Sequence, residues 1–251
     1  EKNNMETSTW RGLGRLARLL AHILAGLWTV YLRFPRLGEA ERRATVQRWA
    51  AEAVRRCGIT LQVRGTPAEP GPDGLMLVAN HISWVDIPTI HAIRFCRFIS
   101  KSEVKHWPVI GRLADSADTL YLQRTSRKDA HRVLHTMAER LQQGDVLAFF
   151  PEGTTSEGKE LLPFHGNLLQ AAISVDAPVQ PVALQFLDAQ GRLSQAPCYI
   201  GDDSLIESLW RTVRAEGVVA RVTFGEPERA QGRSRQQWAQ DLRETVAELR
   251  R

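Results

Sequence analysis

The sequence has 251 residues and is 43% hydrophobic, which is enough to bury one sizeable core, or one core and a small appendage. Its three cysteines are odd in number and widely spaced, which argues against a disulfide framework and favours a reducing compartment. The net charge of +5 is uneven: residues 1–64 hold 12 lysines and arginines against 5 acidic residues, whereas the remainder carries a net charge of −2. This basic front end predicts a polyanionic surface as a partner, either a membrane or a nucleic acid.

The first predicted element is an apolar helix from Trp10 to Phe34, after a short polar stretch that we exclude from the fold. Its uncharged part, residues 19–32, has 14 residues. As a helix this part would be about 21 Å long, less than the ~30 Å hydrocarbon core, so it does not predict a confident membrane span. Arginines at the start and aromatic residues near both ends instead favour a segment that lies in, or dips into, one leaflet. A hydrophobic helix packed on the protein core is the alternative.

A second helix is predicted from Glu39 to Cys57, because Pro35 and Gly38 interrupt the first. One side of it is apolar and much of the remainder is arginine. Two such helices are more typical of a surface anchor than of a nucleic-acid reader, and neither an aromatic-interleaved RNA motif nor a zinc finger accompanies them. We therefore predict a membrane-associating segment over residues 10–57 and an α/β domain over residues 58–251, with no nucleic-acid partner.

Strands and helices alternate over the rest of the chain, which predicts the α/β class. The predicted strands are residues 59–64, 75–79, 96–100, 119–122, 146–150, 179–186 and 218–224. The predicted helices are residues 84–93, with Ser83 as the N-cap, then 109–114, 126–142, 167–175 and a closing helix lined by Trp238, Leu242, Val246 and Leu249. A less regular stretch lies between the last two strands.

The segment from Leu75 to Pro88 carries the first functional signal. Its continuous apolar run is typical of a strand buried on both faces, and this strand delivers Asn80 and His81 to the edge of the sheet. At a strand-to-helix corner the imidazole of His81 can meet the carboxylate of Asp86, and such a pair is a general base. No Gly-x-Ser-x-Gly motif supplies a nucleophile, so the base would act on a hydroxyl group of a substrate. A buried histidine capped by a helix is the alternative.

Three further predicted strands are followed by a polar side chain, as the strand before His81 is. These side chains are Lys101, Arg124 and Glu152. Four such placements on separate strands indicate one site at the edge of the sheet. Neither Cys-x2-Cys nor His-Glu-x-x-His occurs, so no metal site is predicted.

Five short motifs follow one another along the chain: Asn80-His81-Ile82-Ser83-Trp84-Val85-Asp86, Phe98-Ile99-Ser100-Lys101-Ser102-Glu103, Tyr121-Leu122-Gln123-Arg124, Phe150-Pro151-Glu152-Gly153-Thr154 and Pro178-Val179-Gln180-Pro181-Val182. In order and spacing they resemble the lysophospholipid acyltransferase family, of the bacterial 1-acyl-sn-glycerol-3-phosphate acyltransferase type. The resemblance covers residues 59–185 well and the remainder loosely. It implies a central mixed sheet flanked by helices. It also implies acyl transfer from acyl-CoA or acyl carrier protein to lysophosphatidic acid, which gives phosphatidic acid.

The resemblance implies roles for single residues as well. His81 would take the proton of the acceptor hydroxyl, oriented by Asp86, and Lys101 would stabilise the oxyanion or a phosphate. The arginine motif and the turn at Glu152 would hold the phosphate and glycerol of the acceptor. The implied substrate-binding residues are Asn80, Lys101, Arg124, Glu152, Gly153 and Thr154. No metal or redox cofactor is needed, and the implied location is the cytoplasmic face of the inner membrane, as a monotopic or peripheral protein.

Three positions depart from the common pattern of the family. Asp118 stands where glycine is usual, Thr155 where arginine is frequent, and His165 where lysine is common. Two of these changes remove permanent positive charge near the expected phosphate pocket, so the acceptor could be another lyso-lipid, such as a lyso-ornithine lipid. Two further functions are compatible with the same residues: non-catalytic lipid binding, and thioester hydrolysis, in which water replaces the hydroxyl of the acceptor.

Overall fold

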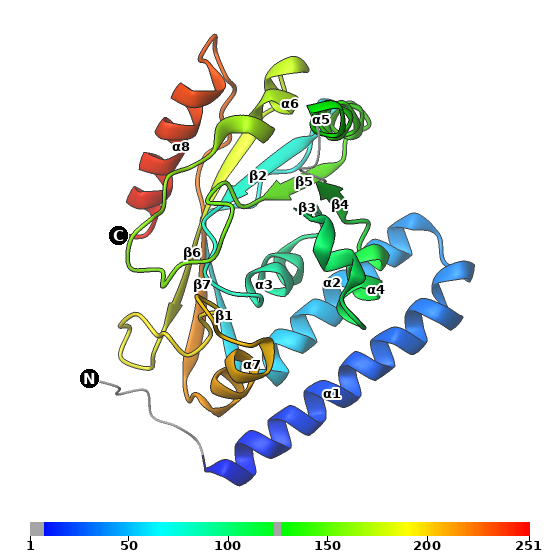
Figure 1. The fold of residues 1–251 in the computed structure, drawn as a ribbon, viewed down its shortest axis with the longest axis vertical. Helices are drawn as coiled ribbons and strands as arrows, with labels where there is room; N and C mark the ends of the chain where they lie inside the picture. The colour runs from blue at the N-terminus through cyan, green and yellow to red at the C-terminus, as the bar shows by residue number, and fades with distance from the viewer. Residues whose placement is uncertain (1–7, 123–126) are drawn as a thin grey trace.

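The computed structural model of the chain describes residues 8–122 and 127–251 (Figure 1). Within these ranges, seven strands form one mixed sheet in the order β1-β7-β6-β2-β5-β3-β4. Neighbouring strands are parallel except β6 and β7, which are antiparallel. The strands are β1 (Ile59–Arg64), β2 (Leu75–Ala79), β3 (Arg97–Lys101), β4 (Leu120–Leu122), β5 (Val146–Phe149), β6 (Val179–Leu187) and β7 (Val218–Phe224). The predicted α/β class and central mixed sheet are confirmed.

The middle of the sheet is buried on both faces because its strands carry continuous apolar runs. All five residues of β2 and all nine residues of β6 are buried. Successive side chains of a strand point to opposite faces. Accordingly, Leu75, Leu77 and Ala79 join one hydrophobic cluster, whereas Met76 and Val78 join a second. Helices therefore cover both faces of the sheet, as expected for parallel strands.

The helices divide between these two faces (Figure 1). They are α1 (Thr9–Leu32), α2 (Glu39–Arg56), α3 (Asp86–Ile93), α4 (Ile110–Ser116), α5 (Arg127–Gln142), α6 (Leu169–Ser174), α7 (Leu205–Arg214) and α8 (Arg235–Leu249). Val54 of α2 and Val213 of α7 pack in the first cluster. Met137 of α5, Leu169 of α6 and Trp238 of α8 pack in the second. Trp238 and Leu242 pack together in this cluster, as predicted for the apolar face of the closing helix.

Helix α1 lies against α2 and α7 and leaves most of its apolar surface uncovered. Arg15 of α1 donates to the carbonyl oxygens of Val213 and Ala215, at 3.0 and 2.8 Å. The exposed large apolar side chains of α1 are Trp10, Leu13, Leu20, Leu24, Trp28, Tyr31 and Leu32. By length and composition, α1 and the turn that follows it could cross a membrane, and only 11% of the most apolar window is buried.

Ion pairs join α2 to the sheet. Asp145, which precedes β5, pairs with Arg43 of α2 and with Arg97 of β3, at 2.7 Å in each case. Arg97 also reaches Glu39 of α2 at 3.2 Å. Because Arg97 is buried, these ion pairs hold α2 against the protein core. The boundary between residues 57 and 58 remains a prediction.

Two local predictions were wrong. Helix α3 begins at Asp86, and the Ser83 hydroxyl does not cap it. Instead, the backbone N–H of Ser83 donates to the Asp86 carboxylate. The stretch before β7 contains α7, which begins with a reciprocal pair of hydrogen bonds between Ser204 and Glu207. This Ser-x-x-Glu spacing is a capping box, a local signal by which the sequence marks the start of the helix.

Candidate active site

The carboxyl ends of three parallel strands meet at one edge of the sheet. Strand β5 pairs with β2 on one side and with β3 on the other. Asn80 and His81 follow β2, Lys101 ends β3, and Glu152 comes three residues after the last residue of β5. The parallel register therefore brings together polar residues that are 71 positions apart in the case of His81 and Glu152. Arg124, the fourth predicted strand-end residue, lies outside the described residues.

His81 and Asp86 face each other across the turn between β2 and α3. The distance from His81 Nδ1 to Asp86 Oδ2 is 2.7 Å. The same oxygen accepts the backbone N–H groups of Ile82, at 2.6 Å, and of Ser83, at 2.9 Å. Asp86 is fully buried. Because an ionised carboxylate only accepts hydrogen bonds, we assign the imidazole proton to Nδ1, which leaves Nε2 free to take a proton from a substrate.

Aromatic rings support the imidazole. The His81 ring stacks on Phe150, with 3.9 Å between ring centroids and 6° between ring planes. Phe150 in turn stacks on Phe98, with 5.5 Å between centroids. The side chain of His81 keeps 19% of its surface exposed. The ring is thus held in one plane but remains accessible. Phe150 was not predicted as a site residue, although it stands directly beside the Pro-Glu-Gly-Thr turn in the sequence.

Asn80 is fully buried and binds the backbone of β6. Its Nδ2 donates to the Leu184 carbonyl oxygen at 3.0 Å, and its Oδ1 accepts the Leu184 N–H at 2.7 Å. These two bonds use both polar groups of the amide and extend the pairing of β2 with β6 past the end of β2. The contacts indicate that Asn80 positions the adjacent His81, and its predicted contact with substrate remains a prediction.

Glu152 is also buried and binds backbone groups. Its Oε1 accepts the N–H of His81 and its Oε2 accepts the N–H of Leu162, both at 2.8 Å. Burial raises the pKa of the Glu152 carboxyl above its usual value, while the two backbone donors and the charges of His81 and Arg250 act in the opposite direction. Glu152 thus ties the turn after β5 to the loop that carries His81. Its predicted contact with the glycerol of an acceptor remains a prediction.

A cavity of about 790 Å³ opens beside His81. His81, Lys101, Gly153 and Thr154 line it, together with many apolar residues of the helices and strands around it. These apolar residues include Leu19 and Ile23 of α1, Val46 and Ala50 of α2, Ile87 of α3 and Leu113 of α4. The volume lies within the roughly 300–1,000 Å³ of small-molecule sites. An apolar lining with a few polar groups suits a hydrocarbon chain with a reactive polar end.

Two of the departures from the family pattern have identifiable surroundings. Asp118 has φ of 57°, in the left-handed region where glycine is most easily accommodated, and it pairs with Arg97 at 2.9 Å. The Thr155 hydroxyl donates to the carbonyl oxygen of Tyr199, and both residues line the cavity. Tyr199 was missed because nothing in its local sequence marks it; only the fold brings it to the site.

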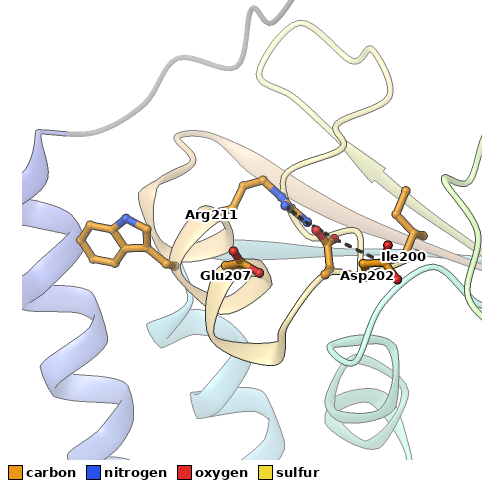
Figure 2. Close-up of a pocket in the computed structure, with 6 residues that line it drawn as sticks. Ile200, Asp202, Glu207 and Arg211 are labelled. Atoms are coloured by element: carbon orange, nitrogen blue, oxygen red, sulfur yellow. Dashed lines mark hydrogen bonds and ion pairs between the residues drawn. The ribbon is translucent and has the colours of Figure 1, made fainter.

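A second, open depression of about 530 Å³ lies near α7. Six residues line it, and Figure 2 shows them: Ile200, Asp202, Asp203, Glu207, Trp210 and Arg211. Arg211 and Asp203 form an ion pair across it at 2.8 Å. None of these six residues lines the larger cavity. No cluster of three potential metal ligands occurs among the residues that the structure describes.

Comparison with known proteins gives consistent matches. A family model described as Acyltransferase matches residues 60–185. The 1-acyl-sn-glycerol-3-phosphate acyltransferase of Neisseria meningitidis serogroup B is 41% identical over 160 residues, which are 64% of this chain and 62% of that protein. The lyso-ornithine lipid O-acyltransferase of Pseudomonas aeruginosa is 36% identical over 243 residues, which are 94% of this chain and 92% of that protein.

A solved structure supports the fold. The 1-acyl-sn-glycerophosphate acyltransferase of Thermotoga maritima superposes with a TM-score of 0.65, covering 94% of this chain and 98% of that chain at 22% sequence identity.

Proposed function

Because the chain belongs to the Acyltransferase family, we propose that it transfers an acyl chain from an acyl thioester to the free hydroxyl group of a lysophospholipid. The observation that carries this proposal is the His81–Asp86 pair, 2.7 Å apart, with His81 in the wall of a largely apolar cavity. The pair supplies a base for a hydroxyl group, and the cavity accommodates a hydrocarbon chain.

The reaction follows from the free nitrogen of the imidazole. His81 Nε2 takes the proton of the acceptor hydroxyl, and Asp86 stabilises the imidazolium that forms. The acceptor oxygen attacks the thioester carbonyl carbon and gives a tetrahedral oxyanion, which Lys101 can stabilise from the cavity wall. The carbon–sulfur bond then breaks, and the leaving thiolate receives the proton from His81. The products are the ester and the free thiol, and His81 is neutral again.

Base catalysis cannot supply the whole acceleration. A positioned general base contributes roughly 10²–10⁴-fold. The remainder must come from holding the hydroxyl and the thioester in contact and from oxyanion stabilisation. The chain's own means of positioning are the stacked ring of Phe150, the bond of Glu152 to the His81 N–H, and the bonds that tie the neighbouring Asn80 to Leu184. No metal or redox cofactor enters these steps, and acyl-CoA or acyl carrier protein serves as the donor.

We propose lysophosphatidic acid as the acceptor, in line with the family motifs and the Neisseria relative. A lyso-ornithine lipid is the second candidate, since the Pseudomonas relative that bears this name aligns over nearly the whole chain. The uncharged Thr155 hydroxyl, which donates to Tyr199, favours the second candidate. An arginine at that position could bind a phosphate through two charged N–H groups, and threonine cannot.

The exposed apolar face of α1 supports residence on a membrane. Its aromatic and leucine side chains, with basic residues at the start of the helix, match the surface expected of a segment in one leaflet. Since α1 also lines the cavity through Leu19 and Ile23, a one-chain lipid could pass from the leaflet into the site along this helix. We propose the cytoplasmic face of the inner membrane as the location.

Product analysis tests the function. Purified protein is incubated with an isotopically labelled acyl chain carried by CoA or by acyl carrier protein. The acceptor is lysophosphatidic acid, a lyso-ornithine lipid or a lysophospholipid with a larger headgroup, each in a separate reaction. Mass spectrometry identifies the lipid products. Labelled phosphatidic acid is the expected product. Labelled ornithine lipid alone would assign the second acceptor. Free fatty acid as the sole product would indicate a thioesterase, and no product with any acceptor would favour a non-catalytic lipid-binding protein.

A further inference from the structure

The carboxylate of Asp86 depends on two peptide groups of the loop that precedes it. The N–H groups of Ile82 and Ser83 donate to the same Oδ2 atom that binds His81. In a trans peptide the carbonyl points away from the N–H. The carbonyl oxygens of the same two peptide groups, which belong to His81 and Ile82, therefore face away from Asp86.

Two residues from distant segments bind these outward carbonyls. The N–H of Ser156 donates to the His81 carbonyl at 2.9 Å, and the N–H of Tyr199 donates to the Ile82 carbonyl at 3.2 Å. The Tyr199 carbonyl in turn accepts the hydroxyl of Thr155. Each peptide group that binds the carboxylate is thus held from both sides, and the position of Tyr199 fixes one of the two.

Arg211 holds the segment on both sides of Tyr199. We call residues 196–203 the strap. The Arg211 side chain extends from α7 and binds the carbonyl oxygens of Ala196 at 3.1 Å and of Cys198 at 2.5 Å, and its ion pair with Asp203 measures 2.8 Å (Figure 2). These partners lie before and after Tyr199 in the chain. The planar guanidinium can bind all three at once, whereas the point charge of a lysine cannot.

We propose that Arg211 is a positioning residue for the acyltransferase site. By holding the strap it fixes the N–H of Tyr199, which holds the Ile82 carbonyl, and thereby aims the Ser83 N–H at Asp86. This inference deepens the proposed function and rests on it for its effect on rate. Arg211 does not line the cavity that holds His81, so it acts through the strap and not on the substrate.

The chain provides a matched control. Arg192 pairs with Asp188 at 2.9 Å, and both residues belong, like the strap, to the connection between β6 and α7. This pair therefore resembles that of Arg211 and Asp203 in kind and in its place in the chain. The hydrogen-bond partners of Arg192 are confined to Asp188 and Gln190, and none of these bonds reaches the strap. Replacing Arg192 removes an ion pair without releasing Tyr199.

Steady-state kinetics is the first test. Arg211→Ala is expected to lower kcat by about 10²-fold, the loss typical of a small displacement of reacting groups, with KM little changed. Arg211→Lys is expected to lie between the wild type and Arg211→Ala, and Arg192→Ala to match the wild type. In an Asp86→Asn background, Arg211→Ala should cause no further loss, because its effect passes through that carboxylate. An equal loss in both backgrounds would contradict the proposal.

Hydrogen exchange is the second test, and it needs no activity. The amides of Ile82 and Ser83 are expected to exchange faster in Arg211→Ala than in the wild type, while Arg192→Ala leaves them unchanged. Unchanged exchange in a folded Arg211→Ala protein would overturn the inference. If the wild type transfers no acyl chain, the proposed function fails, and the exchange result still decides whether Arg211 positions the loop.

Discussion

The buried side chain of His91 makes the free energy of unfolding depend on pH. It is buried on α3, where its Nε2 lies 2.9 Å from the carbonyl oxygen of Cys96 and its ring packs against Phe95 and Phe98. Burial lowers the pKa of His91 from 6.5 to about 4, and the hydrogen bond with Cys96 only partly offsets this. The native state therefore holds this imidazole neutral at pH values where an unfolded chain would protonate it.

The sign and size of the effect follow from linkage. Between pH 6.5 and about 4 the unfolded state binds more protons at this position than the native state, so the free energy of unfolding falls as the pH falls. The stability that depends on a neutral His91 is fully present above pH 6.5, and it is lost once the pH reaches about 4. At about 1.4 kcal/mol per pKa unit, the difference amounts to roughly 3 kcal/mol.

Urea unfolding at pH 7, 5.5 and 4 measures this contribution. His91→Gln retains a side-chain donor for Cys96 but cannot titrate, so between pH 7 and 4 it should lose about 3 kcal/mol less stability than the wild type. His135→Gln is the control, since that side chain is 76% exposed, and it should follow the wild type. If His91→Gln and the wild type lost stability in parallel, the argument from burial would be refuted.

Three further changes test other parts of the structure. Glu152→Gln places an amide nitrogen against a backbone N–H, so the bond to Leu162 or to His81 is lost; kcat is expected to fall between tenfold and 10²-fold while the circular dichroism spectrum is retained. Trp28→Ser removes an exposed aromatic ring from α1 and should weaken binding to anionic vesicles by about tenfold in a flotation assay, with activity on a water-soluble acceptor unchanged. A Cβ atom on Gly26 would lie 2.4 Å from the indole nitrogen of Trp49, so Gly26→Ala should lower the free energy of unfolding by about 1–3 kcal/mol, whereas Gly14→Ala, where the nearest atom is 3.6 Å away, should not destabilise the protein.

Local patterns sufficed for most of the fold. The run Leu75–Ala79 is buried on both faces, as its continuous apolar composition predicts, and the strand ends with His81, Lys101 and Glu152 meet at one edge of the sheet. The burial of the run follows from side-chain periodicity, which is local in the sequence, and the meeting of the strand ends follows from a general rule, that the carboxyl ends of parallel strands lie at one edge of a sheet. The order of the strands and the antiparallel pairing of β6 and β7 were not predicted, because they depend on contacts between distant segments.

The contacts that support the candidate site were harder to predict than the meeting of His81 with Asp86. Asn80 and Glu152 are polar residues in a motif, yet their polar atoms bind backbone groups inside the protein. Sequence shows that such a residue is polar but not whether its partner is a substrate or a peptide group. Tyr199 and Arg211 carry no local signal, since their roles arise from bonds to Ile82 and to the strap.

The role of His81 as the base is tested most directly by measuring the rate of ester formation when its imidazole is removed. His81→Ala is compared with the wild type and with His135→Ala, which removes an exposed imidazole from α5. We expect His81→Ala to lower the rate by about 10²–10⁴-fold, and His135→Ala to leave it unchanged. Ester formation at a near-native rate by folded His81→Ala protein would contradict the central claim that this imidazole is the base.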